Sequence, residues 1–140
     1  MGQRKTVLNI PASAAFTVTA SGDTVTNAQA LATALATPFA PDGQPFSNGL
    51  SVDAQETLLI LFNVTTITAT SIQFLIDTLG DDGVWYPLTT AVSLNAAGQK
   101  YVFTLAGQNS QSNEFGVKCR LRWVVAGAGS VTFSGTIFGK

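Results

Sequence analysis

Over most of the chain, apolar and polar residues alternate in short segments, and turns separate these segments. In "SIQFLIDTL" the side chains of Ile72, Phe74 and Ile76 share one side of an extended chain, because successive side chains of a strand point to opposite faces. The following Asp82 and Gly83 favour a hairpin, since both residue types tolerate a positive φ. This pattern is typical of antiparallel β-structure.

Two further segments extend the pattern. The stretch "TLLILFNVTTI", residues 57–67, is apolar on both faces near its start, which predicts a central strand or one that a partner covers. The stretch "FGVKCRLRWVV", which ends at residue 125, is predicted to send alternate side chains into the core: Val117, Cys119, Leu121, Trp123 and Val125. Repeated short strands of this kind predict an all-β antiparallel sandwich of the jelly-roll type.

The chain of 140 residues is long enough for one β-sandwich domain. We expect residues 1–13 to form an N-terminal arm and residues 27–50 to form a long loop or insertion. The insertion begins alanine-rich, and Thr26 or Asn27 is expected to cap a short helix there. Val84 to Tyr86 should form a short strand that Pro87 ends or restricts to a sheet edge.

The insertion also contains Phe39 and Phe46 in a stretch rich in proline and poor in charge. Loops of this length in compact domains usually have a function or lack order. Two aromatic rings in an exposed loop would be costly to leave in water. Two interpretations follow: a segment that docks on a partner or clasps another subunit, or a loop folded over its own sandwich.

Charge is scarce: 46% of the residues are hydrophobic and only 11% are charged, where an average protein has about 25%. The formal net charge of −1 gives little repulsion between molecules. Such a surface is expected to be covered by neighbours in an oligomer or assembly. No apolar run reaches the 18 residues that a membrane helix requires, so we expect no membrane partner.

Three of the seven basic residues, Lys118, Arg120 and Arg122, occupy alternate positions of one predicted strand. Residues at this spacing share a face, opposite the predicted core face. One interpretation is an outer face paired with acids on neighbouring strands. The other is contact with an acidic patch on another subunit. Nucleic acid is not expected as a partner, because phosphate binding requires clustered excess positive charge.

The sequence offers little for catalysis. It has no histidine and one cysteine, which excludes the usual zinc sites and the His-dependent nucleophilic arrangements. Asp81 and Asp82 are adjacent on a turn, where two carboxylates lack the burial that separates the pKa values of an acid and a base. Cys119 is interpreted as a buried structural thiol. We therefore expect no enzyme and no cofactor.

Several stretches resemble one family. They are "FTVTASGDT" near the N-terminus and "DDGVWYPL", "AAGQKYVFTL" and "VKCRLRWVVAGAGSVTFSGTIFGK" within residues 57–140. Together they resemble the small β-sandwich structural proteins of tailed bacteriophages, especially the head decoration, or cement, proteins. The resemblance covers about the last three-fifths of the chain and the first strand, and residues 27–50 depart from it.

The resemblance implies a virion structural protein on the capsid exterior, made in the host cytoplasm. It would assemble as a homotrimer and bridge major capsid protein subunits. The alternatives are a tail or neck structural protein, or a carbohydrate-binding module on a virion in which Trp85 and Tyr86 stack on sugars. The residues expected to contact partners are Arg4, Lys5, Phe39, Phe46, Lys118, Arg120 and Arg122.

Overall fold

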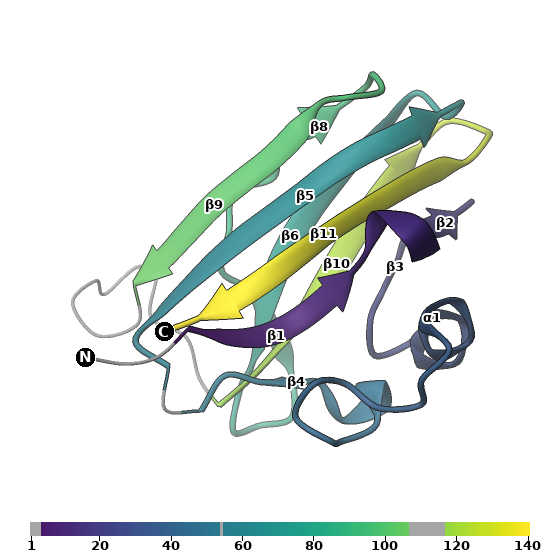
Figure 1. Cartoon of the computed structure of the whole chain (residues 1–140). Coiled ribbons are helices and arrows are strands. Elements are labelled where there is room, and N and C mark those ends of the chain that lie inside the picture. The colour runs from purple at the N-terminus through teal and green to yellow at the C-terminus, as the bar shows by residue number, and fades with distance from the viewer. Residues whose placement is uncertain (1–3, 54, 107–116) are drawn as a thin grey trace.

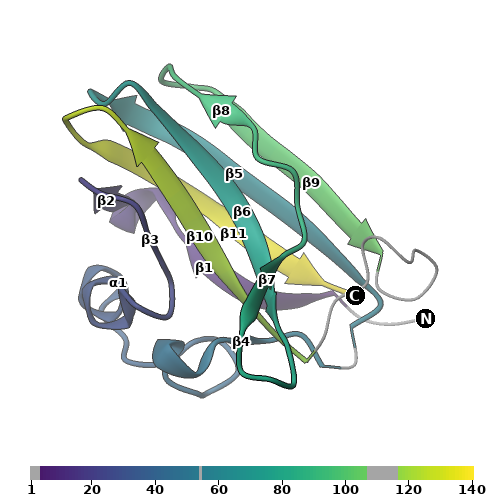
Figure 2. The ribbon, with the colours of Figure 1, turned by 180° about the vertical axis from the view of Figure 1, so that it is seen from behind.

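The computed structural model describes residues 4–53, 55–106 and 117–140, and its strands form two antiparallel sheets that pack face to face (Figures 1 and 2). The first sheet contains β1 (Lys5–Ile10), β2 (Phe16–Val18), β5 (Thr57–Ile67), β9 (Lys100–Ala106) and β11 (Val131–Gly139). The second contains β3 (Gly22–Asp23), β4 (Leu50–Ser51), β6 (Ser71–Leu79), β7 (Trp85–Pro87), β8 (Ser93–Leu94) and β10 (Lys118–Ala126). The prediction of an all-β antiparallel sandwich is confirmed.

The order of the main strands is β1-β11-β5-β9 in the first sheet and β3-β10-β6-β7 in the second. Consecutive long strands change sheet, so β5, β9 and β11 lie in the first and β6 and β10 in the second (Figure 1). Strand β5 lies between β11 and β9, as its apolar sequence predicted. Its even-numbered residues from Leu58 to Val64 point into the core, and Leu59 and Leu61 lie half-buried on the other face.

The core between the sheets is rich in aromatic rings. The ring centroids of Phe74 and Phe133 are 4.9 Å apart, and those of Phe62 and Phe74 are 5.2 Å apart. Aromatic pairs of this geometry contribute about 0.5–1.5 kcal/mol beyond the apolar area that they bury. Gly135 makes the packing possible, because a Cβ atom there would overlap the Phe62 ring and the carbonyl oxygen of Leu61. The alternation of Leu121 and Trp123 into this core is as predicted.

The region 27–50 closes one side of the sandwich, between β1 and β3 (Figures 1 and 2). It contains the short 3-10 helix η2 (Phe46–Asn48) and the helix α1 (Ala28–Leu35). Asn27 is at the N-cap position of α1, as predicted, but its side chain makes no capping hydrogen bond. Helix α1 ends at Ala36, whose φ of 55° is left-handed. A second 3-10 helix, η1 (Ala12–Ala14), follows β1. None of the helices in the described residues is long and apolar enough to span a membrane.

Two expectations require correction. Residues 5–10 of the predicted N-terminal arm form strand β1, which pairs with β11 at the edge of the first sheet. A bulge between Thr6 and Leu8 interrupts the alternation of this strand. Val117 was predicted to point inward but is exposed, because β10 begins one residue later. The predicted hairpin is confirmed: Gly83 has a φ of 80°, and the edge strand β7 follows with Pro87 at its end.

Candidate functional site

Asp77 of β6 lies between the two arginines of the predicted cationic stripe. Its side chain is only 1% exposed. Its carboxylate accepts hydrogen bonds from Nε of Arg120 at 2.8 Å, and from Nε and Nη2 of Arg122 at 2.8 and 3.1 Å. The charge of a buried carboxylate requires this pairing, because an unpaired charge in the interior is costly.

Two other groups complete this ion cluster, which we define as Asp23, Asp77, Arg120, Arg122 and Trp85. Asp23 of β3 approaches Nη1 of Arg120 at 3.3 Å and also accepts hydrogen bonds from the turn that leads to α1. The guanidinium carbon of Arg120 lies 4.9 Å from the centre of the Trp85 ring, a cation–π contact.

The register of β6 against β10 explains the cluster. Arg120 pairs with Asp77, and Arg122 pairs with Asp23 on the other side of β10. The hydrogen bonds with Asp77 raise the pKa of Arg122. Pairing with acids on neighbouring strands therefore accounts for the two arginines of the stripe. Lys118, the third member, lies half-buried at the start of β10.

The two phenylalanines of the insertion have different environments. Phe46 is 2% exposed and packs in the core with Leu31 of α1, so the prediction that it is exposed and contacts a partner was wrong. The reason is local: the turn of η2 directs the ring inward, into the side of the sandwich that α1 closes. Phe39 is 50% exposed and remains available for contact. The loop thus folds over its own sandwich and leaves one aromatic ring outside.

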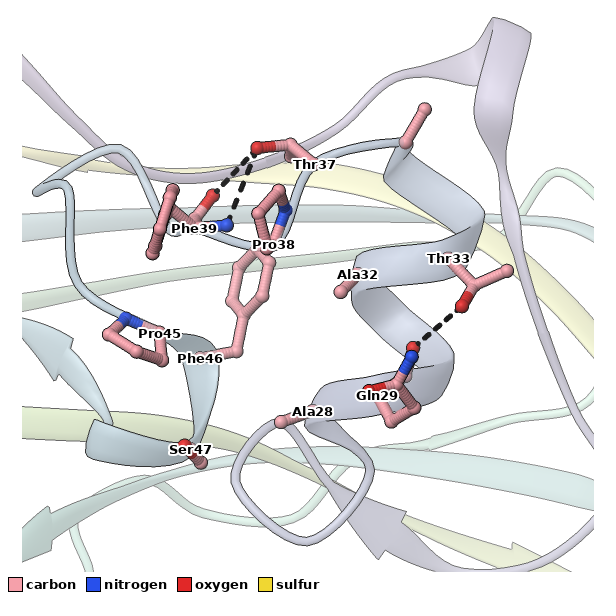
Figure 3. Close-up of a pocket in the computed structure, with 11 residues that line it drawn as sticks. Ala28, Gln29, Ala32, Thr33, Thr37, Pro38, Phe39, Pro45, Phe46 and Ser47 are labelled. Atoms are coloured by element: carbon pink, nitrogen blue, oxygen red, sulfur yellow. Dashed lines mark hydrogen bonds between the residues drawn. The ribbon is translucent and has the colours of Figure 1, made fainter.

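Phe39 borders a groove of about 470 Å³ between α1 and the loop (Figure 3). The hydroxyl of Thr37 bonds both the N–H and the carbonyl of Phe39 at 3.4 Å, which holds the ring at the rim. A second hollow of about 400 Å³ lies between the loop and β1 and shares Thr37, Phe39 and Phe46. No charged residue lines either hollow.

The two N-terminal candidates lie at the edge of the first sheet. Arg4 is exposed, and its guanidinium carbon lies 4.3 Å from the centre of the Phe138 ring. Lys5 is exposed at the first position of β1, opposite Gly139. The predicted contact residues therefore do not gather in one site: they lie on the first sheet, on the second sheet and beside α1.

The outward surface of the first sheet is a feature that the sequence indicated only in part. Leu59 and Leu61 of β5 face outward beside Val102 of β9 and Phe138 of β11, and Val102 is 63% exposed. A shallow hollow of about 320 Å³ lies over Gly135 in this surface. The apolar residues on both faces of β5 indicated that its outward side is apolar. The contributions of Val102 and Phe138 to the same surface follow only from strand pairing.

The hairpin between β6 and β7 carries Asp81 and Asp82, both exposed. The hydroxyl of Tyr86 donates a hydrogen bond to Asp82, and the backbone N–H of Val84 donates another. These bonds lower the pKa of Asp82 and raise the pKa of Tyr86, so Asp82 is ionised at neutral pH. Trp85 lies on the opposite side of the strand, against Arg120, which leaves Tyr86 as the exposed ring of the pair.

Cys119 is fully buried in β10, as predicted, and burial raises the pKa of its thiol to about 12. The thiol is therefore protonated and unreactive at neutral pH. No group of three or more potential metal ligands occurs in the described residues. No model of a known protein family matches the chain, and no curated protein matches it either.

Proposed function

We propose that the chain is a structural protein of a tailed-bacteriophage virion that assembles as a homotrimer, decorates the outer surface of the capsid and bridges major capsid protein subunits. One observation carries the proposal: the chain pairs its buried charge internally but leaves apolar side chains open on its surface. A protein that works alone in water seldom benefits from such a surface, whereas a shell component has it covered.

The exposed positions fit repeated contacts with a shell. Phe39 lies at the rim of an uncharged groove, and Val102 lies on the outside of the first sheet, so apolar contact is offered in two directions. Arg4 and Lys5 add positive charge at the β1 edge of the first sheet. Individually weak contacts of this kind gain strength when many copies act on one shell.

We also propose the jelly-roll form of the sandwich. The strand order supports it: β1-β11-β5-β9 faces β3-β10-β6-β7, which is the order that two interleaved Greek keys give. Jelly rolls are frequent in viral shell proteins, but a fold alone does not establish a function.

The test mixes the purified chain with empty expanded heads of a phage that encodes it and images the shells by electron microscopy. We expect extra density at repeated lattice positions and bound protein in the pelleted shells. Density on tails or necks, or none on any particle, would contradict the decoration role.

Two variants locate the contact. Phe39→Ser should lower occupancy on shells at least 10-fold while circular dichroism and the melting temperature stay unchanged, because the ring is half exposed. Val92→Ser is the matched control, since Val92 is similarly exposed but lies far along the chain from the loop. Equal occupancy for the two variants would remove Phe39 from the contact.

A further inference from the structure

The outside of the first sheet carries a cluster of apolar side chains with one threonine among them, which we call the outer face: Leu59, Leu61, Val102, Thr136 and Phe138. Strand pairing fixes it, because Leu61 lies between Thr136 and Val102, and Leu59 lies next to Phe138 in the neighbouring row. Nothing in the described residues covers Val102.

Positive charge surrounds this outer face. Lys100, at the start of β9, and Lys140, just after β11, are exposed at opposite ends of the sheet along the strand direction. The guanidinium group of Arg4 lies over the Phe138 ring. The described strands of the first sheet contain no acidic residue. The exposed Glu56 comes just before β5, where its backbone N–H bonds the carbonyl of Lys140. The outer face is therefore apolar at its centre and positive at its rim.

The hairpin between β6 and β7 has the complementary character. Asp81 and Asp82 are exposed at its tip, and Val84 and Tyr86 lie two residues apart on one side, each about half exposed. The hairpin belongs to the second sheet, so it lies on the opposite layer of the sandwich from the outer face (Figures 1 and 2). One molecule therefore cannot join its own hairpin to its own outer face.

We propose that the outer face binds the β6–β7 hairpin of a second copy of this chain. Val84 and Tyr86 would pack on Val102 and Leu61, and the two aspartates would lie against the cationic rim. Charge complementarity argues for this occupant: the acids that the structure leaves exposed at the hairpin match the cations that it leaves exposed around the sheet.

The contact joins two different surfaces, so it is heterologous and uses each surface once per molecule. Such contacts close into a ring when the rotation between copies permits, and a trimeric ring is the assembly proposed above. Three strands about 4.8 Å apart and seven residues long give the face roughly 340 Å² in projection. A standard interface buries about 800 Å² per partner, so we expect weak association that needs high protein concentration.

This inference deepens the self-association part of the proposed function but does not require a virion. The experiment is done in solution without shells, so its failure and the failure of shell binding are separate results. It uses the full chain and two variants. The face variant is Val102→Glu, which replaces the most exposed apolar side chain of the outer face by an acid. The hairpin variant is Asp81→Lys with Val84→Lys, which leaves Asp82 and its hydrogen bonds in place.

Sedimentation velocity over a concentration series should show the natural chain associating, and more weakly as salt rises, because the rim charges are screened. Each variant alone should associate at least 10-fold more weakly. An equal mixture of the two should form a dimer of one copy each and nothing larger, because the face variant keeps a working hairpin and the hairpin variant keeps a working face. Val92→Glu, at an exposed position outside both surfaces, should behave as the natural chain.

Three results would overturn the proposal. The first is a natural chain that stays monomeric at about 1 mM, a concentration at which even contacts with millimolar Kd are detectable. The second is association of the variants as strong as that of the natural chain, and the third is a mixture that stays monomeric although circular dichroism shows both variants to be folded. Face-to-face pairing of two sheets predicts that the hairpin variant, which keeps its outer face, associates alone as the natural chain does, so this variant separates face-to-face pairing from the head-to-tail contact.

Discussion

The outward surfaces of the two sheets differ in how far their charged and apolar side chains find partners within the chain. On the second sheet, Asp77 and Asp23 neutralise Arg120 and Arg122, and Trp85 packs against Arg120. On the first sheet, apolar side chains and cations stay exposed. A charge stripe in the sequence is thus not evidence for a partner once its counter-charges are found in the chain. The outward surface of the first sheet, whose cations lack such counter-charges, is the surface for which we expect a partner.

The largest expected effect comes from removing the charge that completes the second sheet. Asp77→Asn keeps the shape but leaves two arginines without a counter-charge, so we expect a loss of about 3 kcal/mol of unfolding free energy. For a chain of this size that corresponds to a melting temperature lower by roughly 10 °C. Urea unfolding measures it. Asp81→Asn, at an exposed site, is the control and should change stability by about 0.5 kcal/mol or less.

The next prediction compares one type of change on the two outward surfaces. Leu75 faces outward on β6 opposite Arg122 but is buried, whereas Val102 faces outward on β9 and is exposed. We expect Leu75→Ala to cost about 2 kcal/mol and Val102→Ala about 0.5 kcal/mol or less. Denaturant midpoints measure both. Equal losses would show that both surfaces are covered to the same extent.

The sequence predicted several of the strands but not the difference between the two outward surfaces. Alternation located β5, β6 and β10, and Asp82 with Gly83 located a hairpin, because these signals are local in the chain. The partner of Arg120 could not be found that way, since Asp23 lies almost a hundred residues away and only strand register joins them.

The loop shows the same limit. Phe39 and Phe46 look alike in sequence, and only the turn of η2 decides that one is in the core and the other outside. Strand β1 was missed because its bulge interrupts the alternation that reveals the other strands. In both cases the missing information was a local backbone feature, a 3-10 turn or a bulge, that the pattern of residue types does not mark.

A smaller effect is expected from the inward side of β10. The pKa of Cys119 is about 12 in the folded chain and near 9 when exposed, so the unfolded state loses a proton first as the pH rises. The stabilising contribution is complete below pH 9 and is lost as the pH rises from 9 towards 12. Between pH 9 and 10 the natural chain should lose about 1 kcal/mol more stability than Cys119→Ala.

Guanidinium unfolding at pH 8, 9 and 10 gives these slopes for both chains. Comparing slopes removes the constant cost of the cavity that the alanine leaves. Parallel lines would mean that the thiol ionises as easily in the folded chain as in the unfolded one. A thiol reagent added at pH 8 should likewise react only after denaturant is added.

The smallest expected effect tests the hairpin. Asp82→Asn removes the charge that holds the Tyr86 proton, so the pKa of Tyr86 should fall toward that of an exposed tyrosine, with little change in stability. Ultraviolet difference spectra over alkaline pH measure the titration. Tyr101, whose pKa burial raises, titrates separately as the internal reference. An unaltered Tyr86 titration would show that the hydrogen bond with Asp82 is not maintained in solution.

The two tryptophans offer separate optical probes of the two environments. Trp123 is buried between Phe16 and Phe133, and Trp85 lies half-exposed over a guanidinium. With Trp85→Phe, fluorescence would come from Trp123 alone and follow the interior. With Trp123→Phe, emission would follow only the outward side of the second sheet, so the order in which acid or denaturant loosens the two could be observed directly.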